Sequence, residues 1–304
     1  MKAGVLETIG QLVVKEVPAP QLAEGSVILR VEVCSICGTD LRIYRHGHAR
    51  IKLPQILGHE IAGEIVAVAD TVTNCRVGER VAITPRISCG ECSYCRKGQP
   101  IYCQRSVSFG YQLPGGYAEY VSVPSRGVEF GVINRIADTL SYEEGALAET
   151  LACCSRAQKA SLVGPGVTVV VVGGGPVGII HCRLARASGA DKVILVEREM
   201  ERLEQVNLAS IDEVIDSAKC NPEARISSLT GGKGADVVIV ACSSAQAQEQ
   251  SLSLAGRGGR VDFFGGLPVG QSKISMDSNL IHYQEISVRG SHGSTPQDNR
   301  EALA

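Results

Sequence analysis

Four cysteines at short, regular intervals form the clearest chemical pattern in the sequence. They lie in the segment SCGECSYCRKGQPIYC, with the spacing C-x2-C-x2-C-x7-C: Cys89, Cys92, Cys95 and Cys103. Two-residue gaps let successive thiolates converge on one ion, and four sulfur ligands suit a closed, tetrahedral zinc site. An iron–sulfur cluster is the main alternative, but the ferredoxin pattern has a shorter last gap followed by proline. The spacing therefore favours a structural zinc ion.

A second candidate metal group is dispersed along the chain. It comprises Cys37 in CGTD, His59 and Glu60 in GHE, and Glu149. Thiolate, imidazole and carboxylate are the ligand types of a catalytic zinc ion that keeps one position open. Each residue also has an ordinary explanation, as a small buried cysteine, a core histidine or a surface acid. Spacing leaves the choice open, because only the fold can bring these residues together.

A glycine-rich turn predicts a dinucleotide site. The pattern G-x-G-x-x-G is formed by Gly173, Gly175 and Gly178. It follows the apolar run VTVVVV and precedes a helix-like segment from Pro176, a context in which the glycines let a pyrophosphate approach the helix N-terminus. Glu197 ends the next strand-like run and is placed to bind the ribose hydroxyls, which favours NAD over NADP. The neighbouring Arg198 is the alternative, because a guanidinium can meet a 2′-phosphate.

Two hydrophobic patterns divide the chain into the elements that must position these groups. The first half has short β-branched runs and predicts an all-β domain with strands at 27–33, 61–68, 77–83 and 117–123. Ser141 and Glu144 form a capping box, which predicts a helix that crosses between the halves. Strand-like runs then follow at 167–172, 192–196, 214–215, 236–241, 260–264 and 285–289. Helix-like segments begin between them near Pro176, Glu199, Pro222, Ala245 and Asp277, and the alternation predicts a parallel sheet.

Length and composition are consistent with this division. The chain has 304 residues, and we expect one domain over residues 1–148 and a second over residues 149–304. A formal charge of -2 and the absence of Trp give no reason to expect a nucleic-acid or membrane partner. No leader or membrane span is recognisable, so the 12 cysteines indicate a reducing, cytoplasmic setting.

The ordered motifs resemble one family over essentially the whole chain. They are CSICGTDLRIY, ILGHEIAGEIVAVAD, VGERVAI, the four-cysteine segment, PGGYAEYVSVP, EGALAETLACC and VVVVGGGPVG. In this order they resemble the zinc-dependent medium-chain alcohol dehydrogenases, most closely the polyol, threonine and secondary-alcohol branch. The resemblance implies a GroES-like β-rich catalytic domain followed by a Rossmann domain with a doubly wound, six-stranded parallel sheet. It also implies hydride transfer from a small-molecule secondary alcohol or polyol to NAD, with two Zn2+ ions per chain.

The same resemblance assigns roles to individual residues. It implies that Cys37, His59 and Glu149 hold the catalytic zinc ion, with Glu60 as a second, exchanging carboxylate. Implied cofactor contacts are Val177, Arg202, Phe264, Gly265, Gly266, Ser291 and His292. In the reaction, Thr39 is placed to relay the alcohol proton through its hydroxyl, and Asp40 to orient His59.

Several departures from the family pattern bear on these expectations. Thr150 stands where the family has Pro after the helix acid, and Arg42 stands where the threonine and polyol enzymes have His after TDL. Cys153 is an alternative ligand on the face of Glu149. Arg42, His46, His48, Phe109 and Tyr111 are candidates for the substrate pocket. A cationic Arg42 suggests an acidic or polyhydroxylated substrate.

Rival functions follow from the same features. Similar family members continue past GSHGSTPQDNREALA into a return to the catalytic domain, which we expect to be missing here. A non-catalytic NAD- and zinc-binding protein is therefore one alternative. A zinc-free quinone or enone reductase is another, against which the intact ligand set argues. By family analogy we also expect a homo-oligomer, dimer or tetramer, that associates through the edge strand near residues 285–289.

Overall fold

The computed structural model describes residues 1–268 and 270–304, which form two compact units. The first unit comprises Met1–Ala152 and Gly293–Ala304, and the second comprises Cys153–His292. Residues 293–304 were counted with the second domain in the sequence analysis, but they group with the first unit because α10 (Pro296–Leu303) packs on β10 (Ile133–Arg135). No helix of the described residues is long and apolar enough to cross a membrane.

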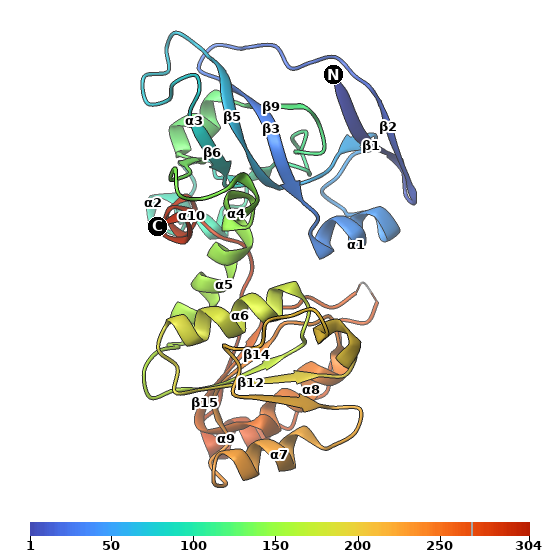
Figure 1. Ribbon diagram of the computed structural model, residues 1–304, viewed down its shortest axis with the longest axis vertical. Coiled ribbons are helices and arrows are strands. Elements are labelled where there is room, and N and C mark those ends of the chain that lie inside the picture. The colour runs from blue at the N-terminus through green and yellow to red at the C-terminus, as the bar shows by residue number, and fades with distance from the viewer. Residues whose placement is uncertain (269) are drawn as a thin grey trace. The chain divides into compact units, whose positions relative to one another are not determined.

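The first unit is built mainly from antiparallel strands (Figure 1). Its largest sheet has five strands in the order β10-β6-β5-β3-β9. The other members of that sheet are β6 (Arg80–Ile83), β5 (Glu60–Val68), β3 (Val27–Ser35) and β9 (Tyr120–Val123). Smaller sheets join β2 (Gln11–Glu16), β1 (Lys2–Thr8) and β4 (Gln55–Ile56), and pair β7 (Arg86–Ile87) with β8 (Val107–Ser108). Alternate apolar residues of the large sheet, among them Leu29, Ile61 and Val81, form the core.

Helices in the first unit were only partly predicted. Besides α10, the unit contains α1 (Gly38–His46), α2 (Ser93–Arg96), η1 (Pro100–Tyr102), α3 (Ser125–Phe130), α4 (Tyr142–Ala146) and the start of α5 (Ala148–Ala160). The predicted capping box forms, because Ser141 Oγ accepts from Glu144 N and Ser141 N donates to the Glu144 carboxylate. Helix α1 was not predicted; it is stabilised by packing of its buried Ile43 against Leu6 and Leu57.

The second unit is a doubly wound parallel sheet, as the sequence predicted. Six strands lie in the order β13-β12-β11-β14-β15-β16, and every pairing is parallel. They are β11 (Thr168–Val172), β12 (Lys192–Glu197), β13 (Glu213–Asp216), β14 (Ala235–Val240), β15 (Ala255–Phe263) and β16 (Ser287–Gly290). Only a short 3-10 helix, η2 (Met200–Leu203), occurs where a helix was expected near Glu199.

Helices cover both faces of this sheet (Figure 1). Val169 and Val171 of β11 pack in the same cluster as α6 (Pro176–Ala187). Val170, which points to the opposite face, packs in the cluster that contains residues of three helices: α7 (Pro222–Leu229), α8 (Ala245–Leu254) and α9 (Ser278–Gln284). The turn from β11 to α6 therefore lies at the carboxyl end of a strand that is central and buried on both faces, a position typical of ligand sites in such sheets.

Candidate functional site

The N-terminus of α1 places two of the candidate site residues. Cys37 is the N-cap, and Asp40, three residues later, accepts a hydrogen bond from Cys37 N at 3.0 Å. Asp40 is buried and accepts a second hydrogen bond, from the Tyr117 hydroxyl at 3.0 Å. Thr39 lies between them in the first helical turn and is half-buried. The helix cap thus fixes the thiol of Cys37 and the carboxylate of Asp40 with respect to each other.

His59 enters the same site from the start of β5. Its Nδ1 lies 3.3 Å from Asp40 Oδ1, which leaves Nε2 for another ligand. The preceding residue, Gly58, has a φ of +89°, and a Cβ there would lie 2.7 Å from both Cys34 Sγ and the Tyr117 ring. The glycine of GHE is therefore required by the backbone turn that presents His59.

The electrostatics of His59 reflect its negative surroundings. Burial opposes protonation of the ring, but contacts with Asp40 and Cys37 and the charge of Glu149 outweigh burial and raise the pKa of His59 well above its usual value. Burial opposes ionisation of Asp40, but its contacts, above all the one with His59, outweigh burial and lower the pKa of Asp40. A positive charge at this position is thus stabilised by the surrounding protein groups.

Three of the four dispersed candidates come together. Ligand atoms of Cys37, His59 and Glu60 all lie within 4.8 Å of one another. Sulfur, imidazole nitrogen and carboxylate oxygen form the donor set of a zinc ion with an open position, so these residues fit the metal. Glu149, at the start of α5, is outside this group although its charge acts on His59, and Cys153 is also outside it. The ligand role of Glu149 stays a prediction.

The residue after Glu149 makes a contact that the sequence analysis did not foresee. Thr150 Oγ1 donates a hydrogen bond to Glu60 Oε1 at 2.6 Å, and both side chains are buried. Thr150 departs from the family pattern, which has Pro here, and its hydrogen-bond partner lies 90 positions away in the sequence. Only the three-dimensional structure reveals the contact.

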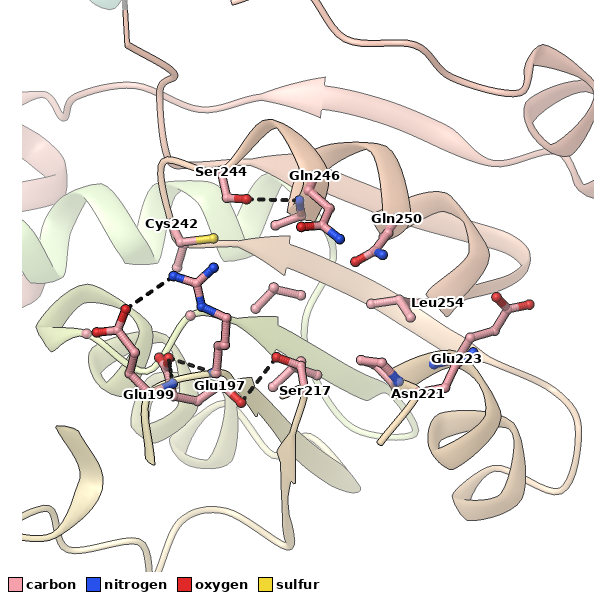
Figure 2. A pocket seen from close by; sticks show the side chains of 18 of the residues that line it. Glu197, Glu199, Ser217, Asn221, Glu223, Cys242, Ser244, Gln246, Gln250 and Leu254 are labelled. Atoms are coloured by element: carbon pink, nitrogen blue, oxygen red, sulfur yellow. Dashed lines mark hydrogen bonds and ion pairs between the residues drawn. The ribbon is translucent and has the colours of Figure 1, made fainter. Parts of the chain in front are cut away.

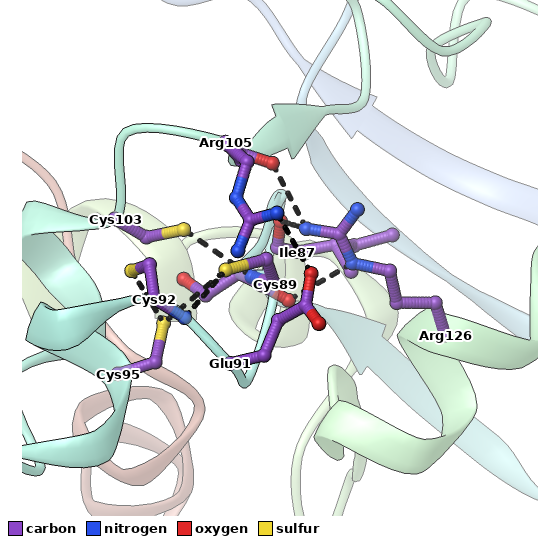
Figure 3. A network of polar contacts seen from close by, with 9 residues as sticks. Ile87, Cys89, Glu91, Cys92, Cys95, Cys103, Arg105 and Arg126 are labelled. Carbon is purple, nitrogen blue, oxygen red and sulfur yellow. Dashed lines mark hydrogen bonds and ion pairs between the residues drawn. The ribbon is translucent and has the colours of Figure 1, made fainter.

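The four-cysteine segment folds into a compact lobe. Cys92 Sγ lies 3.5 Å from Cys95 Sγ, Cys89 Sγ lies 3.9 Å from Cys95 Sγ, and Cys89 N donates to Cys103 Sγ at 3.2 Å. The four sulfur atoms point toward one another (Figure 3). Burial raises the pKa of the Cys89 thiol, but backbone amides around it and the neighbouring cysteines outweigh this and lower the pKa to about 6. A set of four converging sulfurs fits a structural zinc ion.

Two arginines tie this lobe to the rest of the first unit. Arg126 of α3 donates to Ser88 O at 3.1 Å and to Arg105 O at 2.9 Å, and Arg105 pairs with Glu91 at 2.8 Å (Figure 3). The backbone on both sides of the cysteines is therefore held by the α3 side chain.

The glycine-rich turn has the conformation that its pattern predicts. Gly173 follows β11 with a φ of +107°, and Pro176 is the first residue of α6. A Cβ on Gly178 would lie 1.8 Å from Gly173 O, so no other residue fits there. Val177 occupies the first turn of α6.

A cavity of about 760 Å3 lies beside this turn in the second unit. Its lining includes four predicted cofactor residues: Gly173, Gly175, Glu197 and Arg202. Polar residues that the sequence analysis did not single out also line it: Ser217, Asn221, Glu223, Ser244 and Gln246 (Figure 2). These residues follow the carboxyl ends of β13 and β14. The predicted ends of these strands were therefore the sequence feature that could have indicated them.

Glu197 is buried at the end of β12 and is held by the backbone. Its carboxylate accepts hydrogen bonds from Gly174 N, from Arg198 N at 2.7 Å and from Glu199 N at 2.8 Å. A carboxylate offers about four acceptor positions, so capacity for one further donor remains. Next to it, Glu199 forms ion pairs with both arginines of the cavity, Arg198 and Arg202.

The remaining predicted cofactor residues lie outside this cavity lining. Phe264 and Gly265 follow β15, where Gly265 N donates to Val240 O at 2.8 Å, and Gly266 is the exposed next residue. Ser291 is buried after β16 and donates to Asp262 Oδ2 at 2.6 Å, and His292 follows it. Their contact with a nicotinamide ring stays a prediction.

Comparison with known proteins covers both halves of the chain. A family model described as alcohol dehydrogenase GroES-like domain matches residues 23–129, and one described as zinc-binding dehydrogenase matches residues 176–304. An L-threonine 3-dehydrogenase of Pyrococcus abyssi is 36% identical over 284 residues, covering 91% of this chain and 78% of that protein. A sorbitol dehydrogenase of Bacillus subtilis is 32% identical over 295 residues, covering 95% of this chain and 81% of that protein.

A solved structure is similar over nearly the whole length. A zinc-binding dehydrogenase from Sinorhizobium meliloti, solved bound to NADP, superimposes with a TM-score of 0.90 at 33% sequence identity. The match covers 99% of this chain and 86% of that chain.

Proposed function

Because this chain belongs to the zinc-dependent medium-chain alcohol dehydrogenases, we propose that it oxidises the CH–OH group of a secondary alcohol or polyol with a nicotinamide dinucleotide. The observation that carries the proposal is the approach of Cys37, His59 and Glu60 ligand atoms to within 4.8 Å of one another. Because Cys37, His59 and Glu60 are all present and lie together, a zinc-free quinone or enone reductase is disfavoured.

The residues around the metal group have distinct tasks. Cys37, His59 and the carboxylates of Glu60 and Glu149 would hold the ion, which when bound acts as a Lewis acid on an alcohol oxygen. Asp40 fixes the His59 ring through its Nδ1 contact. Oxidation moves a hydride to the nicotinamide and releases a proton, and we assign the relay of that proton to the Thr39 hydroxyl on the first turn of α1.

We propose NAD as the preferred cofactor. Glu197 presents a buried carboxylate at the cavity, where it would repel a 2′-phosphate and accept a ribose hydroxyl. The cations that would otherwise attract that phosphate, Arg198 and Arg202, are paired with Glu199. The structural relative bound to NADP supports a nicotinamide dinucleotide in general and leaves NADP as the alternative.

The setting and assembly of the enzyme are also proposals. None of the cysteines in the described residues forms a disulfide, which is the state that a reducing cytoplasm would maintain. Strand β16 is at the edge of the six-stranded sheet, so it is a surface through which two copies would pair into a homo-oligomer. Light scattering on the purified protein measures that state directly.

One experiment tests the proposed reaction. The purified protein is analysed for zinc and then assayed with secondary alcohols and polyols, with NAD and NADP in parallel, by absorbance of the reduced cofactor. We expect about two zinc ions per chain and turnover with NAD. Cofactor binding without turnover on any alcohol would instead support a non-catalytic NAD- and zinc-binding protein. Reduction of an enone by protein that contains no zinc would support the reductase alternative.

A further inference from the structure

Tyr111 connects the candidate metal group to a cluster of cationic side chains in the first unit. Its ring centroid lies 6.3 Å from that of His59 and 5.2 Å from that of His48, and Arg50 Cζ lies 5.7 Å from it. Gln55 Nε2 donates to Tyr111 O at 2.6 Å and holds the residue in place. A metal ligand and a guanidinium therefore contact the same half-buried aromatic ring.

Chain geometry explains why these groups gather. Cys37 caps helix α1, which carries Arg42 just over a turn further on, while the segment after the helix brings His48 and Arg50 to Tyr111. Arg50 is fixed at two points: its guanidinium donates to Ser106 O at 3.2 Å and its N–H donates to His48 Nδ1 at 3.1 Å. These two hydrogen bonds hold the Arg50 guanidinium in a defined position.

The arginines of this cluster have no carboxylate counterion among the residues that the structure describes. Within residues 1–268 and 270–304, Arg42 and Arg50 form no ion pair with a carboxylate, whereas six other exposed arginines do: Arg30, Arg105, Arg135, Arg198, Arg202 and Arg225. Burial and the charges of Arg50 and Arg42 lower the pKa of His48, so both guanidiniums lie near enough to His48 to act on it. His48 Nδ1 accepts a hydrogen bond from the Arg50 amide.

We propose that Arg42 and Arg50 bind an anionic substituent, a phosphate ester or a carboxylate, on the alcohol substrate. This inference rests on the proposed function, because it assigns the substrate class of the same site. Arginine is suited to the task, since its planar donors match phosphate and carboxylate oxygens. The exposed guanidiniums supply the charge, and the Tyr111 ring supplies an apolar surface between them and the metal group.

A competing explanation is that the two arginines only balance the acids of the metal group. Asp40 and Glu60 are satisfied by other partners: His59 and Tyr117 contact Asp40, and Thr150 donates to Glu60. A general balancing role would affect every substrate alike, whereas recognition of a substituent would affect only substrates that carry it.

The test compares substrates in matched pairs. A polyol is assayed beside the same polyol carrying a terminal phosphate, and a hydroxy acid beside its amide. We expect kcat/KM of the wild type to be about tenfold or more higher for the anionic member of a pair, and the two pairs distinguish phosphate from carboxylate. Arg42→Gln and Arg50→Gln should each lower kcat/KM for the anionic member about tenfold more than for its neutral partner.

The matched control is Arg45→Gln. Arg45 is an exposed arginine of the same helix that also lacks an ion pair in the described chain, but it does not act on His48. We expect this variant to behave as the wild type with every substrate. Equal losses on both members of a pair in the Arg42 and Arg50 variants, or no preference in the wild type, would overturn the proposal.

Equilibrium binding gives a readout that does not depend on turnover. Inorganic phosphate and acetate are titrated calorimetrically into the zinc-loaded protein. We expect binding of at least one anion, weakened about tenfold or more by the double variant and unchanged by Arg45→Gln. Anion binding without oxidation of any alcohol would contradict the proposed function and not the anion site. Oxidation of neutral alcohols with no anion effect would contradict the anion site alone.

Discussion

Thr150 Oγ1 donates a hydrogen bond to Glu60 Oε1 at 2.6 Å, and this contact joins the start of α5 to the first residue of β5. A family-typical Pro at position 150 would have no hydroxyl to offer. In this chain the carboxylate of Glu60 is therefore restrained by a neutral donor from the residue that follows Glu149. Thr150 binds Glu60 and directly follows Glu149 in α5. It therefore connects the two acids that are proposed for the metal group.

We expect Thr150→Val to destabilise the protein by about 1–3 kcal/mol, because it removes the hydrogen bond and leaves a buried carboxylate oxygen without its donor. Urea unfolding of the zinc-free protein measures the change without interference from the metal. Thr150→Ser is the control, since it keeps the hydroxyl, and it should retain most of the stability. If the valine and serine variants unfolded at the same urea concentration, the hydrogen bond would be energetically unimportant.

We expect Cys37→Ser to abolish turnover with every alcohol and to remove one zinc ion per chain, while NADH binding stays within about twofold. The cavity proposed to bind the cofactor lies in the second unit and Cys37 in the first, so the two measurements separate the roles. Cys75→Ser, at a buried cysteine of the first unit outside both candidate metal groups, is the control for loss of a thiol. Turnover near that of the wild type would show that Cys37 is no metal ligand.

The cysteine lobe yields a different expectation. Cys103→Ala should release the second zinc ion and lower the free energy of unfolding by more than about 4 kcal/mol, because the lobe has short elements and little apolar core of its own. Zinc analysis and thermal unfolding measure both effects. The exposed Cys220 provides the control variant Cys220→Ala. Retention of both zinc ions by the Cys103 variant would show that Cys103 is not a ligand of the second ion.

Glu199 allows a test of cofactor choice. Its carboxylate pairs with Arg198 and Arg202, so Glu199→Gln frees both guanidiniums for a 2′-phosphate. Exposed ion pairs are weak, and we expect NADPH to bind about threefold to fivefold tighter while NADH binding is unchanged. Fluorescence titration of both cofactors measures this, with Glu201→Gln as the exposed neighbouring control. A uniform change in both affinities would mean that the pairs do not govern selectivity.

How much the sequence could predict depends on whether a feature is local. The cysteine lobe and the turn at Gly173 are contiguous, so residue types and spacing were enough to predict that the sulfurs converge and that the turn is tight. The six-stranded parallel sheet followed from alternating apolar runs, and its prediction is confirmed.

Features that depend on tertiary contacts were missed or left open. Helix α1 is stabilised by Ile43 packing against Leu6 and Leu57, two residues outside its own segment, and no local pattern reveals this. Its N-terminus is what places Cys37 and Asp40 beside His59, so the dispersed metal group could not be settled from spacing. The grouping of residues 293–304 with the first unit likewise depends on contacts of α10 with β10.

We expect His181 to make the stability of the protein depend on pH in the acidic range. It is fully buried on α6, its Nδ1 lies 3.2 Å from Gln158 Nε2, and its ring meets Phe264 edge-on at 4.6 Å. Burial lowers the pKa of His181 to about 3. The unfolded chain has the ordinary value of about 6.5, so it binds a proton at mild acidity that the folded protein does not. The stability of the neutral form is therefore fully present above pH 6.5 and is lost as pH falls toward 3.

The variant His181→Gln separates the effect of this proton on stability from that of the other protons that the protein binds. Between about pH 6 and 4, His181 should contribute a loss of about 1.4 kcal/mol per pH unit. His181→Gln cannot take up that proton, so its unfolding free energy should fall less steeply by this amount, although it is less stable than the wild type at neutral pH. Urea unfolding at several pH values gives both slopes, with the exposed His282→Gln of α9 as control. Parallel slopes for wild type and His181→Gln would show that His181 takes up its proton in the folded state too.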